Sequence, residues 1–190
     1  MFNAYQKLLD KARFKTSISI LELGSGTGYT SLQIAKKIPT KKITLVDNNN
    51  KMLDVSRKTL RLAKCKKEFI NKDLFHLDLK EKFDLVHSAG LVEHFGGQKK
   101  ERIFNLHAQL TKPGGYCIIY APTPTASYRI LRKTAELLGT WKYTDEIPLT
   151  EKELTQAVKR TGLKIIDVNY FWKHYWLSEV GILAQKISPR

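Results

Sequence analysis

A glycine-rich turn between a buried strand and a helix constrains the fold of this chain more than any other feature. The apolar run Ile18–Leu23 predicts a buried strand, and a helix is predicted from about Tyr29 to Lys37. Glycine occupies alternate positions of the turn between them, which reads Gly24-Ser25-Gly26-Thr27-Gly28. Glycine permits a tight turn and leaves bare backbone on which a ligand can lie. A strand, a tight turn and a helix in this order begin a βαβ unit, so we expect a parallel sheet.

Strands and helices alternate along most of the chain. Further strands are predicted at residues 43–47, 68–70, 83–88, 116–120, 163–168 and 177–185. Further helices are predicted at about 2–12, 48–64, 99–110, 126–138 and 150–162. The last helix opens with a capping box, Thr150 with Glu153 three residues later, and Gly162 ends it. The alternation predicts an α/β fold in which helices cover both faces of a parallel sheet.

The length predicts a single domain that spans residues 1–190. Residues 122–149 are longer than an ordinary connection and contain Pro122 and Pro124, so we expect an insertion that caps the substrate site. Cys65 and Cys117 are far apart and form no Cys-x-x-Cys pair, which argues against a disulfide scaffold and a cysteine zinc site. We expect no metal.

A cytoplasmic location is expected from what the sequence lacks. No apolar run approaches the roughly 18–20 residues of a membrane helix. The first ten residues lack the apolar core of a signal peptide, and sparse cysteine suits a reducing compartment.

The net charge is the unusual global property. Lys and Arg total 33 against 18 Asp and Glu, which gives +15. Such a charge indicates either a soluble surface with weak attraction to polyanions or a nucleic-acid substrate. Much of the excess falls in the basic run from Arg57 to Lys67, on a helix that we expect to flank the sheet as a solvated face.

Two acidic residues near the glycine turn indicate the kind of ligand. Asp47 ends the second predicted strand, where an acid can bind two ribose hydroxyls. The dinucleotide pattern G-x-G-x-x-G fits neither glycine frame, because Tyr29 or Ser31 stands where the last glycine belongs. Glu22 would repel a pyrophosphate, but it would suit a sulfonium and an ammonium group. These residues therefore favour S-adenosylmethionine over a dinucleotide.

The chain resembles the class I S-adenosylmethionine-dependent methyltransferases, and more closely their small-molecule group known as type 11. The resemblance rests on segments that occur in order along nearly the whole chain: 22–28, Asp47, 71–74, 83–95 and 110–115. It implies a Rossmann-like, doubly wound, seven-stranded sheet that is mostly parallel with its last strand antiparallel. It also implies methyl transfer to an oxygen, nitrogen or carbon of a small-molecule or metabolite acceptor, with S-adenosylhomocysteine as the product.

The motifs assign cofactor-binding residues. The glycine turn would hold the methionine part, the acids the ribose and adenine, and the end of the fourth strand the floor beneath the sulfur. The residues are Glu22, Gly24, Ser25, Gly26, Thr27, Gly28, Asp47, Asn48, Met52, Asp73, Leu74, Ser88, Ala89 and Gly90.

Candidates for catalysis and acceptor binding lie at the same edge of the sheet. His94 follows the fourth strand, and histidine is a side chain type that can accept a proton near neutral pH, so it is the first candidate for a general base. Glu93 is the second, and transfer by proximity alone stays open. Aromatic residues in or near the insertion are candidate pocket walls: Tyr120, Tyr128, Trp141 and Tyr143. The aromatic cluster at 170–176, expected between the last two strands, is interpreted as sheet packing.

Alternative functions remain. One is an RNA methyltransferase that uses the basic surface, although the fourth strand ends Ser88-Ala89-Gly90-Leu91 without the Asn/Asp-Pro-Pro-aromatic sequence of adenine amino methylation. Neither cysteine is placed for cytosine C5 chemistry. The others are a NAD-dependent oxidoreductase, which the glycine pattern disfavours, and a cofactor-binding scaffold without activity. The favoured partner is a small-molecule acceptor, and the oligomeric state stays open.

Overall fold

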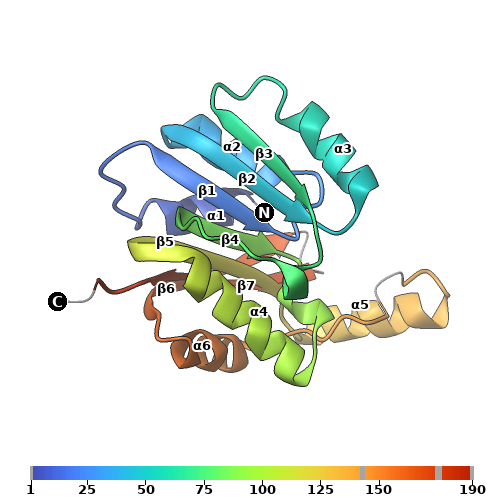
Figure 1. Ribbon diagram of the computed structural model, residues 1–190. Coiled ribbons are helices and arrows are strands. Elements are labelled where there is room, and N and C mark those ends of the chain that lie inside the picture. Colours follow the sequence, from blue (N-terminus) through green and yellow to red (C-terminus); the bar gives the residue numbers. More distant parts are fainter. Residues whose placement is uncertain (1, 142–143, 174–176, 189–190) are drawn as a thin grey trace.

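The computed structural model describes residues 2–141, 144–173 and 177–188. In this part of the chain, seven strands form one sheet in the order β3-β2-β1-β4-β5-β7-β6 (Figure 1). The strands are β1 (Ile18–Leu23), β2 (Thr40–Asp47), β3 (Lys66–Asn71), β4 (Phe83–Ala89), β5 (Thr111–Pro122), β6 (Lys164–Lys173) and β7 (Leu177–Gln185). β1 to β5 pair in parallel, and β7 is antiparallel to both β5 and β6. The predicted doubly wound sheet with an antiparallel last strand is confirmed.

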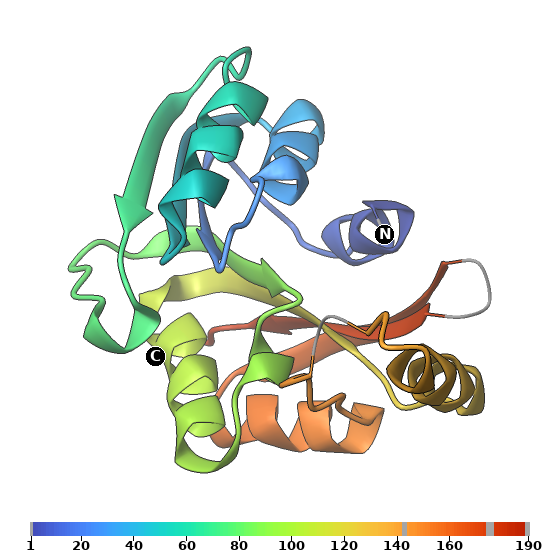
Figure 2. The same cartoon turned by 90° about the vertical axis from the view of Figure 1, so that its right-hand side faces the viewer.

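Helices cover both faces of the sheet (Figures 1 and 2). The helices are α1 (Phe2–Leu9), α2 (Tyr29–Lys37), α3 (Asn50–Thr59), α4 (Gly97–Leu110), α5 (Ala126–Leu137) and α6 (Glu151–Arg160), with short 3₁₀ turns η1 (Leu74–His76) and η2 (Val92–His94). α1, α2 and α3 pack on one face, and α4 and α6 on the other. Successive residues of a strand point to opposite faces of the sheet. Ile20 therefore packs in the core under α1, α2 and α3, and Leu21 packs in the core under α4 and α6.

Local chemistry explains where elements begin. α3 begins at Asn50, later than the predicted 48, because the Asn49 side chain accepts hydrogen bonds from the amides of Lys51 and Met52. The capping box of Thr150 and Glu153 is present as predicted and starts α6. β5 begins at Thr111, before the predicted start at 116, and contains an irregularity at Gly114, where φ is +76° and the pairing with β4 shifts register.

Strand β6 is longer than predicted, whereas β7 has the predicted bounds. β6 extends to Lys173, so Tyr170 and Phe171 lie within a strand rather than in a connection, and positions 174–176 lie outside the described residues. Cys117 is buried in β5, and burial raises the pKa of its thiol. Every helix among the described residues is too short or too polar to cross a membrane.

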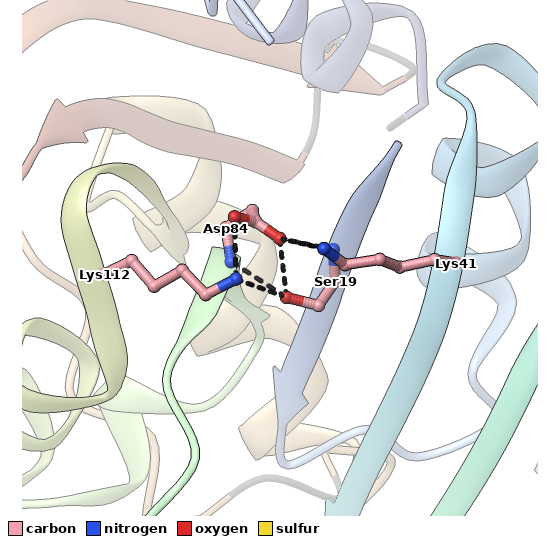
Figure 3. A network of polar contacts seen from close by, with 4 residues as sticks. All are labelled: Ser19, Lys41, Asp84 and Lys112. Carbon is pink, nitrogen blue, oxygen red and sulfur yellow. Dashed lines mark hydrogen bonds and ion pairs between the residues drawn. The ribbon is translucent and has the colours of Figure 1, made fainter. Parts of the chain in front are cut away.

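A polar cluster contains side chains from β1, β2, β4 and β5 at the end of the sheet where β4 begins (Figure 3). The Asp84 carboxylate accepts hydrogen bonds from the Ser19 amide and hydroxyl, both at 2.7 Å, and from Lys112 Nζ at 2.9 Å. Lys41 Nζ lies 3.8 Å from Asp84 Oδ2. These partners outweigh partial burial and lower the pKa of Asp84. The cluster therefore ties β1 and β5 to β4.

Replacing Asp84 tests this tie. Asp84→Ala removes an ionised acceptor and leaves the Ser19 amide unpaired, so we expect the free energy of unfolding to fall by about 2 kcal/mol. Urea denaturation at neutral pH measures the change. Asp78→Ala is the matched control, because Asp78 is exposed and forms an ion pair with the exposed Lys80. An equal loss in both variants would show that the cluster adds no stability.

Candidate active site

A cleft of about 630 Å³ opens where the parallel strands end. Residues that follow β1, β2, β3 and β4 line it, together with one residue from the loop after α5. The lining consists of Gly24, Gly26, Asp47, Asn48, Asn49, Met52, Lys72, Asp73, Leu74, Phe75, Gly90, Leu91, His94, Phe95 and Asp145. Crevices at this edge of an open α/β sheet are where such folds bind ligands.

The glycine turn forms one wall of the cleft. Gly24 has φ +63°, and a Cβ there would lie 2.6 Å from the Leu91 side chain. Gly26 has φ +50°, and a Cβ there would meet nothing within 4 Å. The turn thus needs glycine for its backbone, and at Gly26 it presents bare backbone to open space.

Asp47 fastens this turn to the start of α3. One carboxylate oxygen accepts the Gly26 amide at 2.7 Å, and the other accepts the Asn49 amide at 2.8 Å. The carbonyl of Asp47 accepts hydrogen bonds from the Lys72 amide and the Asn71 side chain. The acid at the end of β2 therefore organises both neighbouring walls.

The residues predicted to surround the adenine lie together on the wall formed by β2 and β3. Asn48, Met52, Asp73 and Leu74 all line the cleft. Asp73 also caps η1 by accepting the Phe75 amide at 2.7 Å. Lys72 and Phe75 were not predicted, although both adjoin the predicted pair in sequence.

Several predicted cofactor residues lie behind the lining. Gly28 packs against Leu45 and Ser56, and Ser88 faces His107 in the other core. Ser25 is buried, and its hydroxyl has no hydrogen-bond partner among the described residues. The predicted residues outside the lining are Glu22, Ser25, Thr27, Gly28, Ser88 and Ala89.

Glu22 belongs to a buried polar network on the face covered by α1 and α2. Ser31 Oγ donates to Glu22 at 2.7 Å and lies 3.0 Å from His87 Nε2. Tyr5 Oη lies 3.3 Å from the other ring nitrogen of His87. Burial raises the pKa of Glu22 to about 8, against the opposing effect of the Ser31 hydrogen bonds. Burial, assisted by His107, lowers the pKa of His87 to about 3, so both groups are neutral at pH 7.

The two candidate bases face different surroundings. His94 ends η2, lines the cleft and is 29% exposed, and its Nδ1 lies 3.0 Å from Asp145 Oδ2. Glu93 is 1% exposed, and its Oε2 has no hydrogen-bond partner among the described residues. Burial raises the pKa of Glu93 to about 8, and the charges of Glu146 and Glu179 add to the effect. His94 is therefore open to the cleft, whereas Glu93 is turned inward.

Among the described residues predicted as pocket walls, Tyr120, Tyr128 and Trp141 are not part of the cleft lining. Tyr120 is buried and stacks on Tyr5 at 4.6 Å between ring centroids. Tyr128 is buried and donates to Glu146 at 2.9 Å, and Trp141 packs edge-on against it at 6.0 Å. Tyr143 lies outside the described residues.

Comparisons with known proteins agree with this geometry. The family model described as "Methyltransferase domain" matches residues 20–115. A malonyl-[acyl-carrier protein] O-methyltransferase from Priestia megaterium is 32% identical over 102 residues, covering 54% of this chain and 36% of that protein. A carboxy-S-adenosyl-L-methionine synthase from Nautilia profundicola is 23% identical over 173 residues, covering 82% and 74%. The chain thus spans about a third of the first relative and about three quarters of the second.

A solved structure shows the same fold. Magnesium protoporphyrin IX methyltransferase from Synechocystis PCC 6803, with bound SAH, superimposes with a TM-score of 0.72 at 17% identity. The match covers 90% of this chain and 74% of that one.

Proposed function

The chain belongs to the methyltransferase domain family, and on this premise we propose that it transfers a methyl group from S-adenosylmethionine to a small-molecule or metabolite acceptor. The proposal rests on one observation: the glycine turn and Asp47 are hydrogen-bonded to each other and line the same cleft at the carboxyl edge of the sheet. Both features were expected for a nucleoside cofactor, and the relatives named above are a methyltransferase and a synthase of a modified S-adenosylmethionine.

The residues present fit this cofactor. The backbone of Gly24 and Gly26 would receive the methionine part, because Gly26 borders open space. Asp47 would accept the ribose hydroxyls, and residues on the adjoining wall would surround the adenine. The cleft carries the carboxylates of Asp47, Asp73 and Asp145 against one lysine, Lys72, which suits a cationic ligand. Buried residues such as Glu22 and Ser25 would hold the turn from behind.

When bound, S-adenosylmethionine supplies a methyl carbon that its sulfonium activates toward in-line displacement. The protein's part is to hold the acceptor in line and to exclude water. We propose that His94 removes the acceptor's proton where the acceptor has one to lose. With Nδ1–H donating to Asp145, a neutral imidazole can take this proton at Nε2.

The acidic cleft favours a small acceptor over RNA. A polyanion would approach carboxylates there, whereas basic residues such as Arg57 and Lys58 lie on α3, which flanks the sheet. The acceptor's identity is open, because the named relatives act on different compounds.

Calorimetric titration with S-adenosylmethionine and with NAD tests the cofactor. We expect saturable binding of the first and no heat with NAD. Absence of binding to S-adenosylmethionine would overturn the proposal. Labelled S-adenosylmethionine added to cell extract then shows whether label enters a small-molecule, lipid, protein or RNA fraction.

Replacing His94 tests the base. With the acceptor found by that screen, His94→Ala is expected to lower kcat by about 100-fold, because the proton must then leave without a positioned base. The affinity for S-adenosylmethionine, measured by calorimetry, should change little. Asp145→Asn should shift the pH profile of kcat by altering the His94 pair. Unchanged turnover in His94→Ala would leave transfer by proximity alone.

A further inference from the structure

The helix α5 presents large apolar side chains to solvent. Ile130 is 63% exposed and Leu137 is 87% exposed, and Leu138, which caps the helix, is 68% exposed. Large apolar side chains gathered on one protruding helix indicate a surface that meets an apolar partner. Figure 1 shows α5 reaching outward from the body of the molecule, beyond the end of β5.

Two of the exposed side chains, Ile130 and Leu137, share the outward face of the helix, and Leu138 lies at its C-terminal end. Tyr128 points to the body and is 1% exposed. At 100° per residue, Ile130 and Leu137 lie within about 20° of each other and almost opposite Tyr128. The exposed bases Arg129 and Lys133 lie beside them on the same side. The outward face is therefore apolar along its centre and cationic along one margin.

The charge of this face is not balanced within the protein. Arg132 pairs with the exposed Glu136 at 2.7 Å. Arg129 and Lys133, by contrast, have no ion-pair partner among the described residues, and the whole chain carries +15. A helix with an apolar stripe and cationic flanks is suited to the interface of an anionic bilayer, with apolar groups among the acyl chains and bases at the phosphates.

The inner face of α5 connects this surface to the cleft. Tyr128 donates to the Glu146 carboxylate, and Arg132 donates to the Glu146 carbonyl at 2.8 Å. Asp145, the neighbouring residue, lines the cleft and pairs with His94. Ile147 donates its amide to the Glu93 carbonyl at 2.8 Å. Residues 145–147 thus form a short, hydrogen-bonded segment between α5 and the rim of the cleft.

We propose that α5 docks the protein on anionic lipid bilayers, with Ile130, Leu137 and Leu138 inserted and Arg129 and Lys133 at the lipid phosphates. Self-association through the same face is disfavoured, because it would bring the bases of two copies together.

Vesicle co-sedimentation tests the docking surface. The chain should bind vesicles of phosphatidylcholine with phosphatidylglycerol, bind phosphatidylcholine alone much more weakly, and dissociate as salt rises. The double variant Ile130→Asp, Leu137→Asp should bind anionic vesicles at least about tenfold more weakly. Lys133→Glu should also weaken binding, without touching the apolar stripe.

A matched control separates the face from a general charge effect. Leu62 is 81% exposed and follows α3 between Arg61 and Lys64. Leu62→Asp therefore also replaces an exposed apolar side chain with an acid in basic surroundings. We expect it to retain binding. An equal loss in Leu62→Asp, unaltered binding in the α5 variants, or a dimer that only the α5 double variant abolishes would each overturn the proposal.

The cofactor titration keeps the two proposals distinguishable. The α5 double variant should bind S-adenosylmethionine as tightly as the parent chain, because none of its substitutions lines the cleft. A parent chain that binds vesicles but not S-adenosylmethionine would contradict the proposed function while supporting the docking surface. A chain that binds S-adenosylmethionine but not anionic vesicles would contradict the docking surface while supporting the proposed function.

Discussion

Asp47→Ala is expected to weaken the binding of S-adenosylmethionine by at least about 100-fold. The substitution removes the carboxylate that we assign to the ribose hydroxyls. It also releases the amides of Gly26 and Asn49, which the two oxygens of Asp47 hold at 2.7 and 2.8 Å. Hydrogen bonds to an ionised group contribute about 1.5–3 kcal/mol each, so losing even two of them accounts for the expected change. Calorimetric titration measures the affinity directly.

Two further variants make this result specific. Asp47→Asn keeps an oxygen that can accept one of the two amides, so its affinity should fall between those of the parent and the alanine variant. Asp78→Ala removes an exposed carboxylate outside the cleft and should leave affinity unchanged. Thermal unfolding of each variant shows whether the fold persists. Unchanged affinity in a folded Asp47→Ala protein would refute the role of Asp47.

The parts of the fold that the sequence predicts are those in which local pattern and burial coincide. Ile18–Leu23 is buried at every position, and its apolar run is sufficient to identify a strand. The start of α3 was less predictable, because Asn48 and Asn49 both have capping side chains and only the structure shows that Asn49 is the cap. Strand β6 was predicted too short because Asn169 interrupts its apolar run, yet that residue is held there by hydrogen bonds with Tyr120 and the Ala4 carbonyl.

The candidate site divides in the same way. Asp47 ends β2, and Asp73 and Gly90 closely follow β3 and β4, so a parallel sheet brings all three to one edge. Asp145 could not be predicted, because it reaches His94 across 51 positions from an irregular segment. The orientation of Glu22 is a matter of strand alternation: it shares the face of Ile20, and its partners Ser31 and His87 come from α2 and β4. The sequence identifies Glu22 as a candidate acid but does not show on which face of the sheet its side chain is buried.

Glu22→Gln is expected to remove much of the pH dependence of stability above neutrality. Folding raises the pKa of Glu22 from an ordinary value of 4.5 to about 8. Between these values the folded state holds a proton that the unfolded state has released, so the free energy of unfolding falls as pH rises through this window. Each such proton corresponds to about 1 kcal/mol per pH unit. Glutamine has no proton to lose, and its amide oxygen can still accept from Ser31 Oγ.

Other buried groups set the range in which this effect is measured. Burial lowers the pKa of His87 to about 3 and that of His107 to about 4. These two histidines therefore make the free energy of unfolding rise with pH, and they do so only below an ordinary histidine pKa of 6.5. Glu93, with a pKa of about 8, acts in the same direction as Glu22. Between pH 6.5 and 8 the parent chain should therefore lose stability with the slope of about two protons, Glu22→Gln or Glu93→Gln alone with about one, and the double variant with almost none.

Urea denaturation at several pH values across this window measures these slopes, and the comparison at pH 8 is the most decisive. There Glu22→Gln should be more stable than the parent, because the parent must keep a carboxyl protonated that the unfolded chain ionises freely. A variant that is less stable than the parent at pH 8 would mean that the carboxylate form of Glu22 is the one the fold prefers. Glu22 would then be available as a charge for the cationic cofactor, and its role behind the glycine turn would be electrostatic rather than structural.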